Sequence, residues 1–258
     1  MDYREQKSRN RGLADLGRRV DDVRPEIERR LRSGRTPVRV LEIGMGLGTA
    51  LMELRRLYGD RVELHGVNRA RTDGDWPMVC DSAIANGVMT WAETQAATPL
   101  AFLYGDVSRG LDLPDAYFDL VFSQAAFFWF TDKARVIEEV DRVLLPDGVA
   151  RLDLRIRRGG LPPERATSLV VRGPRGDIPF WQYVRRFPAL RECRVPRRRI
   201  VALWRRLRGV RPPHITKQPY LEVHKTPGGL SLGLKLAEVV DLHTLNEQWW
   251  GCQSIYRA

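Results

Sequence analysis

The sequence of 258 residues has few cysteines, almost no lysine and no long apolar run. Its cysteines, Cys80, Cys193 and Cys252, are odd in number and lack C-x-x-C spacing, which argues against a disulfide framework and against a zinc site. No segment approaches the roughly 20 apolar residues that are needed to cross a bilayer. We therefore expect a soluble, cytoplasmic protein without a membrane span, a secretion signal or a structural metal.

Positive charge is concentrated in one part of the chain. The formal net charge is +11, but residues 41–150 hold 9 basic and 17 acidic side chains, whereas residues 151–211 hold 18 basic and 4 acidic ones. The excess of arginine over lysine, 38 to 5, can come from a GC-rich coding sequence. Base composition does not explain why the charge gathers in one stretch. The pattern indicates an acidic core joined to a basic segment suited to a polyanion.

The stretch Val38–Gly48, V-R-V-L-E-I-G-M-G-L-G, is typical of a buried parallel strand that ends in a glycine-rich turn. Gly44, Gly46 and Gly48 permit a sharp turn and the close approach of a ligand. Apolar residues at helical spacing then predict a helix at Thr49–Tyr58, which Gly-Asp ends. The stretch therefore predicts a cofactor site at the end of the strand.

A second pattern at Leu113–Ala150 predicts a strand, a helix and the start of another strand. With V-L-E-I-G-M-G-L-G, it resembles the class I S-adenosylmethionine-dependent methyltransferases over residues 38–155. The resemblance implies a Rossmann-like α/β fold with a doubly wound, mostly parallel sheet, S-adenosylmethionine as the cofactor and methyl transfer as the reaction. A lone G-x-G-x-G turn also occurs in dinucleotide-binding proteins, so the second pattern is needed for this interpretation.

The resemblance also assigns residues to the cofactor. Glu42 would lie near the methionine end, and Asp106, beside Val107, would accept from the adenine amino group. Asn68, after the predicted strand Val62–Val67, stands where the family usually has an acid that binds both ribose hydroxyls. An asparagine can still accept from one hydroxyl, and Asn68→Asp should preserve or tighten binding. The implied cofactor-binding residues are Glu42, Gly44, Met45, Gly46, Gly48, Asn68, Asp106, Val107 and Ser123.

The fourth predicted strand, Phe118–Ser123, would bring Ser123 and Gln124 to the carboxyl edge of the sheet, where either could orient the nucleophile. The aromatic run 127–130 could stack a planar acceptor or enclose the sulfonium, although we expect part of it to pack in the core. The predicted substrate-binding residues are Phe127, Phe128, Trp129, Arg197, Arg198, Arg205 and Arg206.

We expect one methyltransferase domain with an N-terminal helical region (1–35), a cofactor-binding core (36–155), a basic cap or insertion (156–213) and C-terminal strands (214–258). Arg4, Arg9 and Arg11 form either a frayed tail or an arm that touches a polyanion. The long crossover between Asn68 and the third predicted strand, Leu100–Tyr104, indicates an insertion. Its Trp76 and Trp91 either line the substrate opening or pack in the core. The last strands are expected at Tyr220–His224 and in the closing W-W-G-C-Q-S-I-Y-R.

Two functions stay open at this point. The favoured one is methylation of an RNA base, with ribosomal RNA as the preferred partner and antibiotic self-resistance as a fitting role. The alternative is a small-molecule N- or O-methyltransferase of secondary metabolism, in which residues 156–213 are a substrate lid. A non-catalytic cofactor-binding protein is the least favoured reading. The sequence indicates neither the methylated atom nor the oligomeric state.

Overall fold

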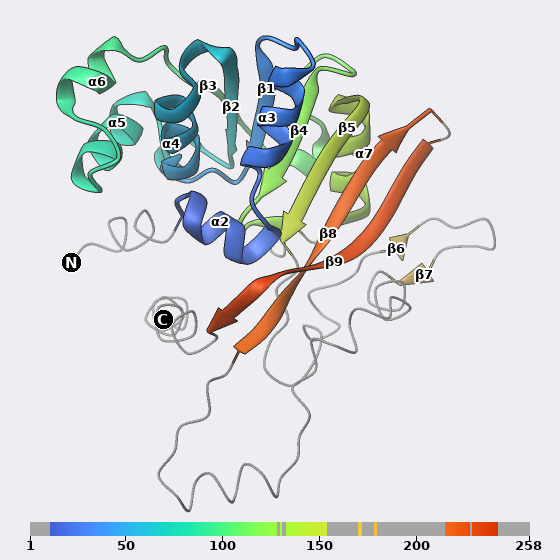
Figure 1. The fold of residues 1–258 in the computed structure, drawn as a ribbon. Helices are drawn as coiled ribbons and strands as arrows, with labels where there is room; N and C mark the ends of the chain where they lie inside the picture. The colour runs from blue at the N-terminus through green and yellow to red at the C-terminus, as the bar shows by residue number, and fades with distance from the viewer. Residues whose placement is uncertain are drawn as a thin grey trace, which may run out of the picture.

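A computed structural model gives the structure of residues 11–127, 130, 133–153, 170–171, 178–179, 215–227 and 229–241. Within these residues, the main sheet has the strand order β3-β2-β1-β4-β5-β8-β9 (Figure 1). Its strands are β1 (Val38–Ile43), β2 (Val62–Asn68), β3 (Ala101–Tyr104), β4 (Phe118–Ser123), β5 (Leu144–Asp153), β8 (Ile215–Thr226) and β9 (Gly229–Asp241). A separate short pairing joins β6 (Val170–Val171) and β7 (Ile178–Pro179).

The order of the strands places a switch point between β1 and β4. The chain winds outward from β1 to β3 and then crosses back to β4 and β5, and all five strands run parallel. The β8–β9 hairpin then adds two antiparallel strands beyond β5. The predicted doubly wound, mostly parallel α/β fold is thus confirmed. In such sheets, ligands bind at the carboxyl ends of the strands on either side of the switch point.

Helices cover both faces of the sheet. The α-helices are α2 (Leu13–Val20), α3 (Arg24–Arg32), α4 (Thr49–Tyr58), α5 (Trp76–Ala85), α6 (Trp91–Ala96) and α7 (Lys133–Val143), and the 3-10 helices are η1 (Gly59–Arg61), η2 (Arg71–Asp73) and η3 (Val107–Arg109). Among the described residues, no helix is long and apolar enough to span a membrane.

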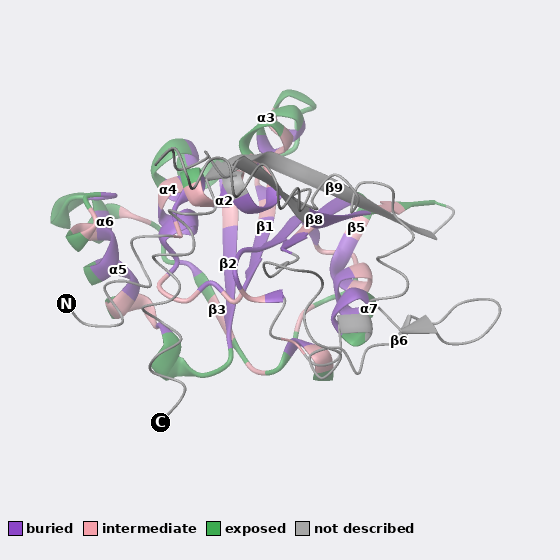
Figure 2. Cartoon of the chain, turned by 90° about the horizontal axis from the view of Figure 1, so that it is seen from below, coloured by how far each residue is buried: buried purple, intermediate pink, exposed green. Residues whose placement is uncertain are grey.

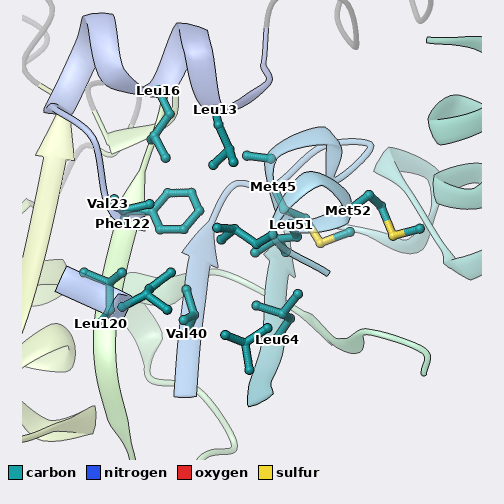
Figure 3. Close-up of a cluster of buried hydrophobic side chains, with 14 of the residues drawn as sticks. Leu13, Leu16, Val23, Val40, Met45, Leu51, Met52, Leu64, Leu120 and Phe122 are labelled. Atoms are coloured by element: carbon teal, nitrogen blue, oxygen red, sulfur yellow. The ribbon is translucent and has the colours of Figure 1, made fainter. Parts of the chain in front are cut away.

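Alternate residues of β1 serve two separate hydrophobic clusters. Val40 belongs to the cluster that packs against α2, α3, α4 and α5, whereas Leu41 belongs to the cluster that packs against α7. In the first cluster, Leu13 and Leu16 of α2 point toward the side chains that surround Phe122 of β4 (Figure 3). The central strands are almost entirely buried, while α6 carries exposed residues (Figure 2). This double covering explains why β1 reads as a nearly continuous apolar run.

The predicted N-terminal helical region contains two helices, α2 and α3. The break follows α2 at Asp21, which has a positive φ of 71° that a right-handed helix does not allow. The helix α3 is attached to the sheet through Arg30, whose Nη1 lies 2.9 Å from Oδ1 of the fully buried Asp119 on β4. Another nitrogen of Arg30 donates to the carbonyl oxygen of Asp147, at an irregularity in β5.

The predicted insertion after Asn68 consists of η2, α5 and α6. Trp76 is partly buried and packs against the first cluster, whereas Trp91 is exposed. The predicted strand at Tyr220–His224 lies within β8, and its partner is β9. The closing W-W-G-C-Q-S-I-Y-R and most of the segment 156–213 lie outside the described residues, so their predicted roles stay predictions.

Candidate cofactor and methyl-transfer site

The glycine loop follows β1 and joins it to α4. The backbone N–H groups of Gly44 and Met45 both donate to the carbonyl oxygen of Val67 on β2, at 2.8 and 3.1 Å. Gly44 has a φ of +73°, and a Cβ atom there would lie 2.2 Å from the Cβ of Ala126. Any side chain at position 44 would therefore collide with the segment that follows β4. The loop brings the ends of β1, β2 and β4 together.

Met45 contributes its backbone to this loop and its side chain to the core. The side chain is fully buried, and a Cβ atom on Gly66 would lie only 1.7 Å from its sulfur. The thioether thus crosses β2 where that strand has no side chain. A cofactor contact by Met45, as the sequence predicts, would have to come from its main chain.

Asn68 is placed beside the loop, as predicted, but its side chain is already engaged. Its Oδ1 accepts from the N–H of Gly46 at 2.8 Å, and its Nδ2 donates to the carbonyl oxygen of Gly46 at 2.9 Å. Nδ2 also lies 3.4 Å from the carbonyl oxygen of Gly74. The side chain is almost fully buried. These contacts give Asn68 a positioning role between two loops, and they do not support the predicted ribose contact.

Glu42 lies on β1 and has a carboxylate that is completely buried. Nε2 of Gln124 donates to its Oε1 at 3.2 Å, while its Oε2 has no hydrogen-bond partner in the described structure. Burial raises the pKa of Glu42 to about 8, although the nearby cations Arg11 and Arg19 and the Gln124 amide act in the opposite direction. A buried carboxylate oxygen without a partner is uncommon and indicates a donor supplied by a ligand.

Gln124 connects Glu42 to the N-terminal segment. Its Nε2 also donates to the backbone carbonyl of Arg11 at 2.6 Å, and its Oε1 accepts from Nη1 of Arg19 at 3.1 Å. Arg19 is itself buried, and this desolvation lowers its pKa. Because the amide of Gln124 is fully buried and bonded on both sides, it does not face an acceptor. Gln124 therefore positions its neighbours in this structure, and its predicted orientation of the nucleophile stays a prediction.

Ser123 has a similar structural function. Its hydroxyl donates to Oδ1 of Asp153 at 3.3 Å and accepts from the N–H of Phe127 at 3.0 Å. The same carboxylate oxygen accepts from the N–H groups of Ala126 and Phe127. Burial raises the pKa of Asp153. Ser123 and Asp153 thus fix the turn after β4, and the structure does not support a catalytic role for Ser123.

Phe127 is part of the core instead of a substrate wall. It is fully buried in the second hydrophobic cluster, with Leu41 and Val121 among its members. The predicted stacking of an acceptor on this ring has no support, because the ring is covered by the sheet and α7. The remaining predicted substrate residues, which are Phe128, Trp129, Arg197, Arg198, Arg205 and Arg206, lie outside the described residues.

Asp106 lies after β3 at the same edge of the sheet. Its Oδ1 accepts from the backbone N–H of Ser108 at 3.0 Å and from the Ser108 hydroxyl at 2.7 Å. The hydroxyl contact lowers the pKa of Asp106, so that the carboxylate is ionised at neutral pH. The side chain is 46% exposed, whereas Val107 is buried. Asp106 can therefore accept from a ligand that reaches this edge.

A separate open hollow of about 430 Å³ lies between α2, α4 and α5. It is lined by Gly12, Ala14, Asp15, Thr49, Glu53, Ala85, Asn86 and Val88. None of the predicted cofactor-binding residues is among them. Within the part of the chain that is described, no group of His, Cys, Asp or Glu side chains is arranged to hold a metal ion. The glycine loop with Glu42, Asn68 and Asp106 is therefore a better candidate for the cofactor site than this hollow.

These features fit S-adenosylmethionine. The orphaned Oε2 of Glu42 suits the ammonium group of the cofactor, the glycine loop allows close approach, and Asp106 suits the adenine amino group. The sequence at 41–152 matches the family model of a methyltransferase domain. Residues 41–152 are therefore similar to a class I methyltransferase domain. S-adenosylmethionine is the cofactor that this similarity implies.

Solved methyltransferase structures also resemble the domain. One is an S-adenosylmethionine-dependent methyltransferase from Aquifex aeolicus, with 20% identity, coverage of 59% of this chain and 78% of that chain, and a TM-score of 0.37. Another is an arsenic(III) S-adenosylmethionine methyltransferase from Chlamydomonas reinhardtii, with 27% identity, coverage of 45% and 38%, and a TM-score of 0.37.

The chain spans about half or less of the length of the first solved structures that it matches. No protein of curated function matches it at a significant level. At this degree of similarity, the acceptor has to be inferred from the chain itself.

Proposed function

We propose that this chain is an S-adenosylmethionine-dependent methyltransferase that acts on a base of RNA, with ribosomal RNA as the favoured substrate. The observation that carries the choice of acceptor is the separation of charge. Residues 41–150, which lie within the methyltransferase domain, have more acidic than basic side chains, whereas residues 151–211 have 18 basic and 4 acidic ones. Phosphate binding depends on lysine and arginine, so the basic segment would hold the RNA while the domain supplies the chemistry.

The bound cofactor would supply a methyl group on a positively charged sulfur. The chain contributes proximity and orientation, which are large effects in a reaction between two bound molecules. Gly46 leaves room for a ligand beside the loop, Glu42 offers a buried acceptor, and Asp106 offers a partly exposed acceptor after β3 at the same edge of the sheet. Hydrogen bonds of the Ser123 and Gln124 side chains hold the segment after β4 in place.

Methylation of a small molecule is the second candidate, and the burial of Phe127 favours it. An RNA methyltransferase was expected to stack the target base on an aromatic wall, and one member of that wall belongs to the core. In this alternative, residues 156–213 would cover a small acceptor and their arginines would have no polyanion to bind.

Methyl transfer from labelled S-adenosylmethionine tests the proposal. Ribosomal subunits, naked ribosomal RNA, transfer RNA and a metabolite extract should be compared side by side at matched concentrations. We expect label in an RNA fraction that is lost with a Gly44→Val variant, whose side chain would collide with Ala126. Label only in the metabolite extract would overturn the RNA assignment and support the second candidate.

A further inference from the structure

Three arginines gather on the turns that follow β2 and β3, at the carboxyl edge of the sheet. Arg69 and Arg71 come directly after β2, and Arg109 belongs to η3, after β3. All three side chains are exposed. The two turns are neighbours, because Asn68 and Tyr104, the last residues of the two strands, are partners in the sheet. Since β3 is the edge strand, the arginines lie on the rim of the domain (Figure 1).

These arginines are less neutralised than others on the surface. On α3, the exposed Arg29 lies 2.7 Å from a carboxylate oxygen of Glu26. Within the described residues, Arg69 and Arg71 form no ion pair, and Arg109, whose side chain is 87% exposed, has one at 3.9 Å. A guanidinium without a close carboxylate keeps its charge and its donors available for an anion from solution.

The acidic side chains among the arginines are bonded within their own turns. Oδ2 of Asp73 accepts from the N–H of Ala70 at 3.3 Å, and Oδ1 of Asp75 accepts from the N–H of Met78 at 3.2 Å. Asp106 is bonded in the same way to the residue two places further on. These acids offset the arginines in number, so any attraction for an anion comes from the placement of the guanidinium groups and not from a net excess of charge.

An aromatic side chain lies among the arginines. The guanidinium carbon of Arg71 is 5.9 Å from the centre of the Tyr104 ring, which stacks on Phe102 with 6.3 Å between the ring centres. The Tyr104 hydroxyl donates to the carbonyl oxygen of Gly74 at 3.1 Å and so fixes the turn that carries Arg71. Tyr104 itself is 38% exposed. Arginines beside an exposed aromatic ring suit a nucleic acid, which offers both phosphates and flat bases.

We propose that Arg69, Arg71, Tyr104 and Arg109, here called the rim, form a contact surface for the phosphate backbone of the RNA substrate. This inference rests on the proposed function. A strand that delivers one base to the carboxyl edge of the sheet carries its neighbouring nucleotides across the rim, where their phosphates meet the arginines. The turns 69–73 and 107–109 present no large exposed apolar side chain, which favours RNA over a lipid surface.

Filter binding of naked ribosomal RNA over a salt series tests the rim. A triple variant with Arg69→Gln, Arg71→Gln and Arg109→Gln should bind this RNA about tenfold more weakly or worse at low salt. The slope of log affinity against log salt should fall by about 0.7 for each phosphate contact that is lost. The affinity for S-adenosylhomocysteine, measured by calorimetry, should change by less than about twofold, because that ligand carries no phosphate.

Two matched variants separate local contacts from net charge. Replacing Arg24, Arg29 and Arg32 of α3 with Gln removes the same number of exposed charges from a helix that is attached to the amino end of the sheet. This control should keep the RNA affinity and the salt slope of the wild-type chain. Lysine at the three rim positions should restore most of the slope, since counterion release depends on charge. Thermal unfolding of each variant shows whether the fold is kept.

Three results would overturn the rim while leaving the proposed function in place. One is an unchanged RNA affinity and salt slope in the triple Gln variant. Another is an equal loss in the α3 control, which would assign the effect to net charge. The third is binding to phosphatidylglycerol vesicles that the triple variant loses while its RNA binding stays intact. Failure of the wild-type chain to label any RNA fraction is a different outcome, since it would overturn the RNA assignment together with the rim.

Discussion

Glu42 illustrates how a single buried acid can couple ligand binding to pH. Burial raises its pKa to about 8, so most of the free protein carries a protonated Glu42 at pH 7. The groups that face it are Gln124, on the segment after β4, and Arg11 and Arg19, on the N-terminal segment. A bound ammonium favours the ionised carboxylate and therefore lowers this pKa in the complex.

Between the two pKa values, binding should release a proton, and affinity should rise with pH toward about 8. Calorimetry of S-adenosylhomocysteine binding at pH 7, in buffers with different heats of ionisation, measures the number of protons released. We expect a fraction approaching one proton for the wild-type chain and none for Glu42→Gln. Equal proton release by both chains would assign the effect to another group.

A second prediction at the scale of one residue concerns the effect of Asn68→Asp on stability and ligand binding. Asn68→Asp would remove the donor that bonds the carbonyl oxygens of Gly46 and Gly74 and would place a carboxylate next to them. We expect a loss of about 1–3 kcal/mol of stability and weaker S-adenosylhomocysteine binding. Chemical denaturation and calorimetry measure the two effects.

The same substitution at a less critical asparagine is the control. Asn86→Asp changes a partly exposed side chain at the end of α5, where Nδ2 donates to the carbonyl oxygen of Ser82. It should have little effect on cofactor affinity. Tighter binding by Asn68→Asp would instead support the ribose contact that the sequence predicted.

At the scale of elements, α3 is attached to the amino end of the sheet by a buried ion pair. Asp119 of β4 is completely buried and accepts from Arg30 of α3 and from the backbone N–H of Arg39 on β1. Arg35, between α3 and β1, lies 2.6 Å from the same carboxylate. Asp119 therefore joins three consecutive segments far from the candidate site.

Asp119→Ala should destabilise the fold by about 3–5 kcal/mol, because it removes the buried carboxylate that Arg30, Arg35 and the N–H of Arg39 share and leaves Arg30 with Glu26 as its remaining carboxylate. Urea denaturation measures the change. Asp115→Ala is the matched control, since Asp115 is 77% exposed and its partner Arg142 keeps Glu139. A similarly small effect of both variants would show that α3 is held mainly by its apolar contacts.

At the scale of the whole molecule, the separation of charge makes a prediction about salt. If the basic segment holds RNA, replacing Arg197, Arg198, Arg205 and Arg206 with Gln should weaken RNA binding without changing cofactor affinity. Each lost phosphate contact should reduce the slope of log affinity against log salt by about 0.7–0.9. Filter binding over a salt series measures this slope. An unchanged slope, with activity on a small acceptor retained, would favour the lid interpretation.

Local patterns in the sequence were sufficient for most of the architecture. The strand at Val38–Ile43, the glycine turn and the helix at Thr49–Tyr58 occur as predicted, because apolar periodicity and glycine act through neighbouring residues. The doubly wound sheet and the methyltransferase domain were implied by the resemblance of these stretches to the class I methyltransferases. The division of the N-terminal helical region into two helices was not predicted, since Asp21 adopts a positive φ that its residue type does not require.

The roles of the polar side chains were decided only by the tertiary structure. The sequence placed Asn68, Ser123 and Gln124 at the carboxyl edge of the sheet. It could not show that their side chains form hydrogen bonds within the chain, with Gly46, Asp153 and Glu42 respectively. Arg11 lies 33 residues from Gly44 along the chain and still donates to its carbonyl oxygen. Periodicity records which residues are buried, whereas the partner of a buried polar atom depends on segments that only folding brings together.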